Sequence, residues 1–201
     1  GTNKGGLNYF DIANKQFHHF KHDPNDSTSL ANNRVYSLLI DSDKNLWIIS
    51  SSDGYLAAGE LQMLPHNENK FINLIDNCAF GIVESHTDNF WFGGIGGVWH
   101  YNKKNKLFNF IENNESIGYV HCVFEDSRNM LWIGSEKGLV KYNARLKLFH
   151  TFTETDGHPF NFVFGILEDN QQNLWISTST GLVKFINAVN SVQNPQYKIY
   201  D

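Results

Sequence analysis

Leu131-Trp132-Ile133-Gly134-Ser135-Glu136-Lys137-Gly138 is the clearest copy of a segment that recurs along this chain. Trp47, Trp91 and Trp175 stand in similar Leu/Phe-Trp-Ile/Phe steps, so the four tryptophans are separated by 44, 41 and 43 residues. A glycine follows each tryptophan six or seven residues later, at Gly54, Gly97, Gly138 and Gly181. A period near 43 residues made of short strand-like segments is typical of a β-propeller, in which each period forms one four-stranded blade.

Each period predicts four strands. The segment that ends about seven residues before the tryptophan is almost continuously apolar, which indicates an innermost strand buried on both faces. The innermost strands are expected at Val35–Ile40, Ala79–Glu84, Val120–Glu125 and Val163–Glu168. The tryptophan strand and a third strand after the repeated glycine come next. The outer strands are expected at Phe17–Phe20, Phe71–Leu74, Leu107–Ile111, Leu148–Phe152 and Tyr197–Tyr200.

We therefore expect an all-β fold, a single β-propeller arc over residues 1–201. An outer half-blade at 1–22 precedes four complete blades of antiparallel strands at 33–75, 77–111, 118–152 and 161–201. The first of these is the most irregular: its third strand should start at Tyr55, and Met63-Leu64-Pro65 reads as an added loop. Because the chain opens within a repeat, we expect it to be a piece of a longer array.

Small residues mark two positions of the repeat. Ten residues before the tryptophan stand Ser37, Gly81, Cys122 and Gly165, as expected where innermost strands crowd together around an axis. This steric role explains Cys122 without any reactivity. The repeated glycine after the tryptophan predicts a positive φ or a close backbone approach.

The repeats resemble the two-component regulator propeller repeat of bacterial membrane receptors. The best matches run from Phe124-Glu125-Asp126 to Gly138-Leu139 and from Leu167-Glu168-Asp169 to Gly181-Leu182. Two features depart from that family. The glycine usual before the Asn-Leu-Trp step is replaced by Lys44, Asp88, Asn129 and Gln172, and the Gly-Thr element is Ile49-Ser50 in one blade.

The resemblance implies an extracytoplasmic, periplasmic sensor region of an inner-membrane protein. In that family, further blades, a β-sandwich, a transmembrane helix and a cytoplasmic histidine kinase or diguanylate cyclase would follow. This chain would carry none of the catalytic residues of such a parent, and it would meet the membrane only through parent segments.

An incomplete ring predicts self-association. Each terminal blade would expose several hundred Å² of apolar surface, and at about 25 cal/mol per Å² that is on the order of 10 kcal/mol of burial forgone. We expect the open propeller ends to pair, so a monomer at high concentration in light scattering would contradict the expectation.

Composition excludes other partners. The net charge is −5 and lysine and arginine do not cluster, which argues against nucleic acid, because binding requires a basic patch that replaces counterions. No apolar run approaches the length that spans a bilayer.

No cofactor and no metal site is predicted. His18 and His22 would lie roughly 13 Å apart on one strand face, too far to share a metal. Asp41-Ser42-Asp43-Lys44-Asn45 begins like a calcium loop but continues with Leu46 and Ser52, where glycine and glutamate are needed. Gly93–Gly97 reads as a turn between strands, since no helix follows to bind phosphate.

A candidate ligand site lies on one side of the propeller. Because successive strands alternate in direction, the loops that enter the innermost strand and those that follow the tryptophan strand should share that side. Amides beside aromatic rings suit the hydroxyls and ring faces of sugars, although the same residues could serve strand starts and packing between blades. The candidate binding residues are Asn33, Arg34, Tyr36, Asn77, Phe80, Tyr119, His121, Asn161, Phe162 and Phe164.

These observations favour a non-catalytic sensor module that binds an extracellular glycan or a small-molecule signal. Two other classes stay open: a propeller enzyme that acts on glycans, and a protein-interaction scaffold. The enzyme would need convergent acids or a metal, so turnover abolished by changing His121 or Arg34 would favour it. No in-phase Gly-His or Trp-Asp steps support a WD-type scaffold.

Overall fold

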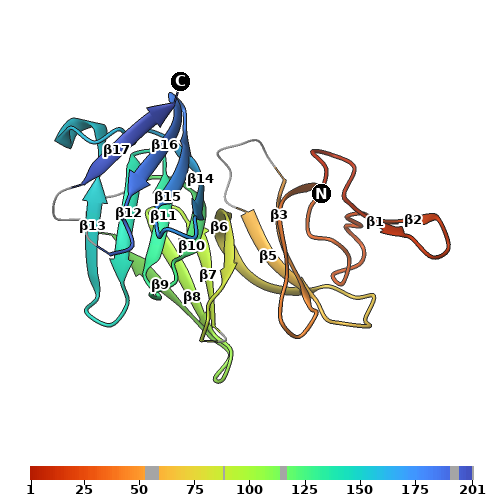
Figure 1. The fold of residues 1–201 in the computed structure, drawn as a ribbon. Coiled ribbons are helices and arrows are strands. Elements are labelled where there is room, and N and C mark those ends of the chain that lie inside the picture. Colours follow the sequence, from red (N-terminus) through yellow and green to blue (C-terminus); the bar gives the residue numbers. More distant parts are fainter. Residues whose placement is uncertain (53–58, 88, 114–116, 191–194, 201) are drawn as a thin grey trace. The chain divides into compact units, whose positions relative to one another are not determined.

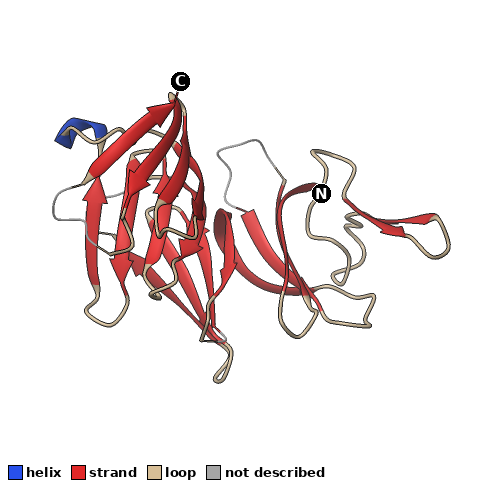
Figure 2. Cartoon of the chain, viewed as in Figure 1, coloured by secondary structure: helices blue, strands red, loops and turns tan. Residues whose placement is uncertain are grey.

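The computed structural model describes residues 1–52, 59–87, 89–113, 117–190 and 195–200, with Ala79 described in its backbone only. Within these ranges the regular secondary structure consists of β-strands and one 3-10 helix, η1 (Glu154–Asp156), joined by turns and loops (Figure 2). The chain divides into two compact units, Gly1–Phe80 and Gly81–Asp201. Across the described ranges, no helix has the length and apolar character needed to cross a membrane.

The first unit contains a hairpin and one blade (Figure 1). The hairpin pairs β1 (Leu7–Asp11) with β2 (Gln16–Phe20) in antiparallel register. The blade follows in the order β3 (Arg34–Ile40), β4 (Leu46–Ser51), β5 (Gly59–Leu64) and β6 (Ile72–Glu84), and the last four residues of β6 belong to the second unit. The core of this unit includes Leu7, Leu30, Val35, Ile48 and Phe71.

The second unit contains three successive blades (Figure 1). In the blade that starts with the end of β6, the sheet continues through β7 (Asn89–Gly94), β8 (Gly97–Asn102) and β9 (Leu107–Glu112). The next blade consists of β10 (Val120–Glu125), β11 (Leu131–Ser135), β12 (Gly138–Asn143) and β13 (Leu148–Phe152). The last blade consists of β14 (Val163–Glu168), β15 (Leu174–Thr178), β16 (Gly181–Ile186) and β17 (Gln196–Tyr200). The predicted half-blade and four antiparallel blades are thus confirmed.

One blade differs from the prediction in detail. Its third strand is β5, so Met63 and Leu64 end a strand rather than form a loop, while the predicted start at Tyr55 lies outside the described residues. Gln62 explains this strand: its fully buried amide donates to Asn73 Oδ1 at 2.6 Å and accepts from the backbone N–H of Ala31 at 2.6 Å. These two hydrogen bonds of the Gln62 side chain keep β5 in the sheet.

The predicted break between blades 33–75 and 77–111 falls inside a strand. β6 runs without interruption from Ile72 to Glu84, although an outer strand ending at Leu74 and an inner strand starting at Ala79 were expected. Asn77 adopts φ 65° within it, a conformation that asparagine tolerates better than most residues. The left-handed residue is therefore accommodated in the strand instead of ending it.

Three of the four repeated tryptophans are anchored in the same way. The indole N–H of each donates to the carboxylate of the aspartate six residues before it. The distances are 2.8, 2.7 and 3.0 Å in the pairs Trp47–Asp41, Trp132–Asp126 and Trp175–Asp169. Since the aspartate sits in the turn before the tryptophan strand, the bond ties that turn to the blade. The fourth, Trp91, has Ser85 at the aspartate position.

Backbone conformation explains the repeated glycines and their replacements. Gly138 has φ 133°, and a Cβ on Gly97 would lie 2.3 Å from the carbonyl oxygen of Ile111, so the expected positive φ and the expected close approach both occur. Gly54 lies outside the described residues. In the preceding turn Lys44, Asn129 and Gln172 have φ 67°, 62° and 62°, which is why the resembling family favours glycine there.

The innermost strands are buried on both faces only where a blade lies on each side. β10 contacts β7 and β14, and none of its residues is exposed. In β14, by contrast, Phe164 is 45% and Leu167 69% exposed, and in β3 Ile40 is 70% exposed. The expectation of two buried faces therefore holds for β10 and is wrong for β3 and β14.

Candidate functional site

The loops that carry the candidate residues share one side of the second unit. The backbone N–H of Glu136, in the turn after β11, donates to the carbonyl of Tyr119 at 3.1 Å. In the last blade, Ser179 donates in the same manner to Phe162 at 3.2 Å. The loops before the innermost strand and after the tryptophan strand therefore meet, as predicted from the alternation of strand directions.

An aromatic cluster of three candidate residues spans two neighbouring blades on that side. The ring of His121 in β10 lies 5.2 Å from the ring of Phe164 and 6.4 Å from that of Phe162, between centroids. The two phenylalanine rings stack at 6.5 Å, and they are 40% and 45% exposed. The cluster thus combines a buried imidazole with two ring faces that solvent can reach.

The imidazole of His121 is neutral at physiological pH. Its residue is 7% exposed, and burial lowers the pKa of the ring below its ordinary value, while the nearby carboxylate of Glu136 opposes that shift. A neutral imidazole both donates and accepts a hydrogen bond, which suits hydroxyl groups.

The two other candidates of this unit lie beside the cluster in the chain. Tyr119 is half-buried, and its backbone N–H donates to Glu136 Oε2 at 3.3 Å. Asn161 is half-buried and directly precedes Phe162. Together with the aromatic cluster they form the loop-face site: Tyr119, His121, Asn161, Phe162 and Phe164.

The remaining candidates lie in the first unit, where their contacts are structural. Asn33 Oδ1 accepts the backbone N–H of His22 at 2.9 Å, and Arg34 Nε donates to the carbonyl of Asn3 at 3.3 Å. Tyr36 and Phe80 form an edge-to-face pair at 4.8 Å. Asn77 is exposed in its left-handed conformation. Binding by these five side chains stays a prediction.

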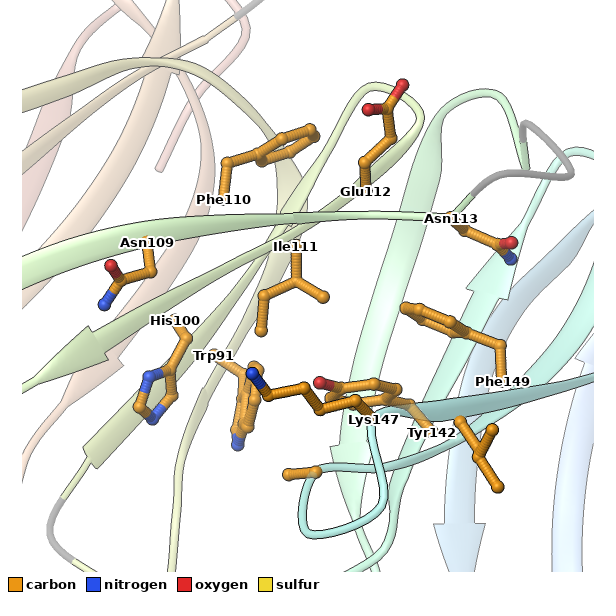
Figure 3. A pocket seen from close by; sticks show the side chains of 12 residues that line it. Trp91, His100, Asn109, Phe110, Ile111, Glu112, Asn113, Tyr142, Lys147 and Phe149 are labelled. Carbon is orange, nitrogen blue, oxygen red and sulfur yellow. The ribbon is translucent and has the colours of Figure 1, made fainter.

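Sequence reasoning missed a cavity of about 760 Å³ elsewhere in the second unit. It lies between the blade of β7–β9 and the blade of β10–β13, and Figure 3 shows its lining side chains. The lining includes Trp91, His100, Asn109, Ile111, Tyr142, Lys147 and Phe149. The sequence did carry a signal for it. Six residues before the tryptophan, where the other three blades have aspartate, the blade of β7–β9 has Ser85.

The thiols offer no nucleophile. Burial raises the pKa of both Cys78 and Cys122 to about 12, so each stays protonated at neutral pH. Among the residues the structure describes, no three His, Cys, Asp or Glu side chains gather as a metal site requires. The steric interpretation of Cys122 agrees with its place in the crowded innermost strand.

Three segments of the chain match a known protein family. The family described as Two component regulator propeller matches residues 29–52, 114–137 and 157–180. Three segments of the chain are therefore similar to two component regulator propeller repeats. The matched residues include Trp47, Trp132 and Trp175, whereas the propeller repeat around Trp91 lies outside them.

One relative of these propeller repeats is the protein named Histidine kinase P4 of Formosa agariphila. It is 28% identical over 164 residues, which cover 78% of this chain and 12% of that protein. The chain thus corresponds to a small part of the relative's length.

Two solved structures share the propeller fold. One, described as the extracellular domain of the hybrid two component system BT3049 from B. thetaiotaomicron, has a TM-score of 0.74 at 20% identity, over 100% of this chain and 26% of that one. The other, virginiamycin B lyase from Staphylococcus aureus, has a TM-score of 0.72 at 13% identity, over 98% of this chain and 62% of that one. At these identities the likeness shows the fold.

Proposed function

We propose that this chain is a non-catalytic, extracytoplasmic sensor region of a membrane signalling receptor and that its loop-face site binds a carbohydrate. The propeller repeats and the relative named as a histidine kinase support the receptor assignment. The observation that carries the ligand proposal is the aromatic cluster, in which Phe162 and Phe164 present ring faces beside the neutral imidazole of His121. Sugar rings pack on such faces while their hydroxyls pair with planar polar groups.

Phe164→Ala is expected to weaken binding of an oligosaccharide at least tenfold, because it removes the most accessible ring of the cluster. Calorimetric titration with a panel of neutral and acidic oligosaccharides would first identify a binder and then compare the variant with the parent sequence. Leu107→Ala, which truncates a 56% exposed side chain of β9, is the matched control and should leave the affinity unchanged. Equal affinities for the parent chain and Phe164→Ala would contradict the proposal.

A propeller enzyme acting on glycans is the competing function. It would turn over the oligosaccharide that binds, and His121→Ala would abolish turnover. The sensor proposal expects the oligosaccharide to be recovered intact after prolonged incubation with the protein.

Self-association through an uncovered blade face is proposed as the means by which the sensor couples to a second subunit. Leu182 of the last blade is 39% exposed, whereas its repeat equivalent, Leu139, is fully buried by the following blade. Leu167 of β14 lies on the same face of this blade and is 69% exposed. These apolar side chains form a face that a second copy could cover.

The double variant Leu167→Glu/Leu182→Glu is expected to shift the protein from dimer or larger species to monomer. Light scattering over a concentration series measures this directly. Two charges on the exposed face would oppose its burial, while the buried face of the same blade is left intact. A parent chain that stays monomeric at the highest concentration would refute the association.

A further inference from the structure

Trp91, the second of the four repeated tryptophans, is held differently from its three equivalents. Ser85 replaces the aspartate, and its hydroxyl pairs with that of Thr87 at 3.0 Å rather than with the indole. Trp91 is 6% exposed, yet its indole N–H donates to no residue in the part of the chain that the structure describes. The indole nitrogen of Trp91 is not among the buried polar atoms without a partner, so its N–H is accessible to a ligand that can accept a hydrogen bond.

The residue opposite the tryptophan on the next strand has changed as well. In two blades that residue is a lysine whose ammonium lies over the indole, at 4.8 Å for Lys141 over Trp132 and 5.0 Å for Lys184 over Trp175. Opposite Trp91 it is His100, with its ring centroid 4.4 Å away. Burial lowers the pKa of His100, against the opposing effect of Glu125, so this imidazole is neutral.

The acid and the base that enclose the indoles of Trp132 and Trp175 are therefore both replaced by neutral groups around Trp91. Where both are present they interact, as Lys184 and Asp169 do at 3.4 Å. Ser85 and His100 make no such pair, which leaves the edge and the N–H of Trp91 available to a ligand.

The space beside Trp132 or Trp91, between its blade and the next, is filled or left open by the loop between the third and fourth strands of the next blade. In the last blade the connection between β16 and β17 turns inward: Ala188 and Val189 are buried, and the carbonyl of Ala188 accepts from Lys141 Nζ at 3.5 Å. In the preceding blade the connection between β12 and β13 is only residues 144–147, all of which are exposed. The short turn does not cover Trp91, and the cavity of about 760 Å³ remains.

The lining of this cavity has the composition of a sugar site. Trp91 and Tyr142 supply aromatic surface, with their rings edge-to-face at 5.9 Å. Figure 3 shows the Lys147 amine directed toward Trp91 and the side chain of Asn109 near that of His100, its partner on the adjacent strand. A volume between about 300 and 1,000 Å³ with a few convergent polar groups is that of a small-molecule site.

We propose that the cavity between these two blades binds a single pyranose ring. Its apolar face packs on Trp91 and Tyr142, and one of its oxygens accepts the indole N–H of Trp91. The hydroxyls pair with His100, Asn109 and Lys147. This site is separate from the loop-face site and does not depend on it.

The test follows the indole N–H signal of Trp91 by NMR during titration with D-glucose, D-galactose, D-mannose and D-glucuronate. Trp91→Phe assigns the signal and removes the donor. We expect at least one sugar to shift this signal saturably, with a dissociation constant on the order of 1 mM. For Trp91→Phe, calorimetry with that sugar should show affinity at least fivefold weaker.

Ser85→Asp/His100→Lys is the decisive variant, because it gives Trp91 the aspartate and the lysine that contact the indoles of Trp132 and Trp175. It is expected to fold, to raise the melting temperature by about 2–4 °C, and to abolish the saturable shift. Lys184→His, the corresponding change at the indole of the last blade, should leave sugar binding at Trp91 unaltered.

Absence of a saturable shift up to about 50 mM of every sugar would overturn the proposal, as would a shift that persists in Ser85→Asp/His100→Lys. Phe164→Ala distinguishes the two sites, since it should weaken oligosaccharide binding at the loop face and leave the Trp91 signal responsive.

Discussion

Asp126→Ala is expected to lower the free energy of unfolding of the second unit by about 3–5 kcal/mol. The carboxylate is fully buried and accepts three hydrogen bonds, from the indole of Trp132 at 2.7 Å and from the backbone N–H groups of Arg128 and Met130 at 2.9 Å each. Alanine would leave the indole and the turn donors without this acceptor. Urea denaturation followed by tryptophan fluorescence measures the loss.

Asp126→Asn and Arg128→Ala complete that experiment. Asparagine keeps one acceptor oxygen, so its effect should be intermediate. Arg128 is exposed in the same turn, and removing its side chain leaves its backbone N–H in place, so stability should change by less than about 0.5 kcal/mol. A loss below about 1 kcal/mol for Asp126→Ala would show that the tryptophan anchor is not a main source of blade stability.

Gly81→Ala is expected to lower the free energy of unfolding by about 2–3 kcal/mol, although it adds one methyl group to a strand. A Cβ at this position would lie 2.7 Å from the backbone nitrogen of Val123 and 2.9 Å from the carbonyl carbon of Cys122. Both are backbone atoms of the adjacent innermost strand, so relief requires β6 and β10 to move apart. Thermal and urea unfolding of the variant would report the strain.

Gly165→Ala is the matched control, since Gly165 occupies the same position of the repeat in the last blade. Within 4 Å its Cβ would meet only the Ser177 hydroxyl, at 3.0 Å, among the described residues. That side chain can rotate away, so the expected loss is below about 1 kcal/mol. Similar losses for the two variants would show that crowding between innermost strands is not what selects glycine at position 81.

The repeat made most of the fold predictable from the sequence. Strand order and strand pairing within a blade depend on local hydrogen-bond ladders, and four in-phase copies reveal them together. Two of the errors in strand boundaries fall where a copy is irregular. Leu64 ends a strand because the buried amide of Gln62 holds β5 in the sheet, and β6 continues through Asn77 because asparagine tolerates its positive φ.

The candidate sites were predictable only in part. The alternation of strands correctly brought the Tyr119 and Glu136 loops together, and with them the cluster of His121, Phe162 and Phe164. The exchange of aspartate for Ser85 was visible in the sequence, but its meaning depended on knowing that the aspartate accepts the indole N–H.

By itself, the sequence determined the blade: its period, its four strands, the tight turns at the repeated glycines and the small residues of the innermost strand. These follow from interactions between residues close in the chain, which repeat with the sequence. Only the tertiary structure decided which grooves between blades are filled. That depends on whether a loop from the next blade turns inward, as at Ala188, or stays exposed, as at Leu146. A cavity is an absence of packing between distant segments, so no local pattern encodes it.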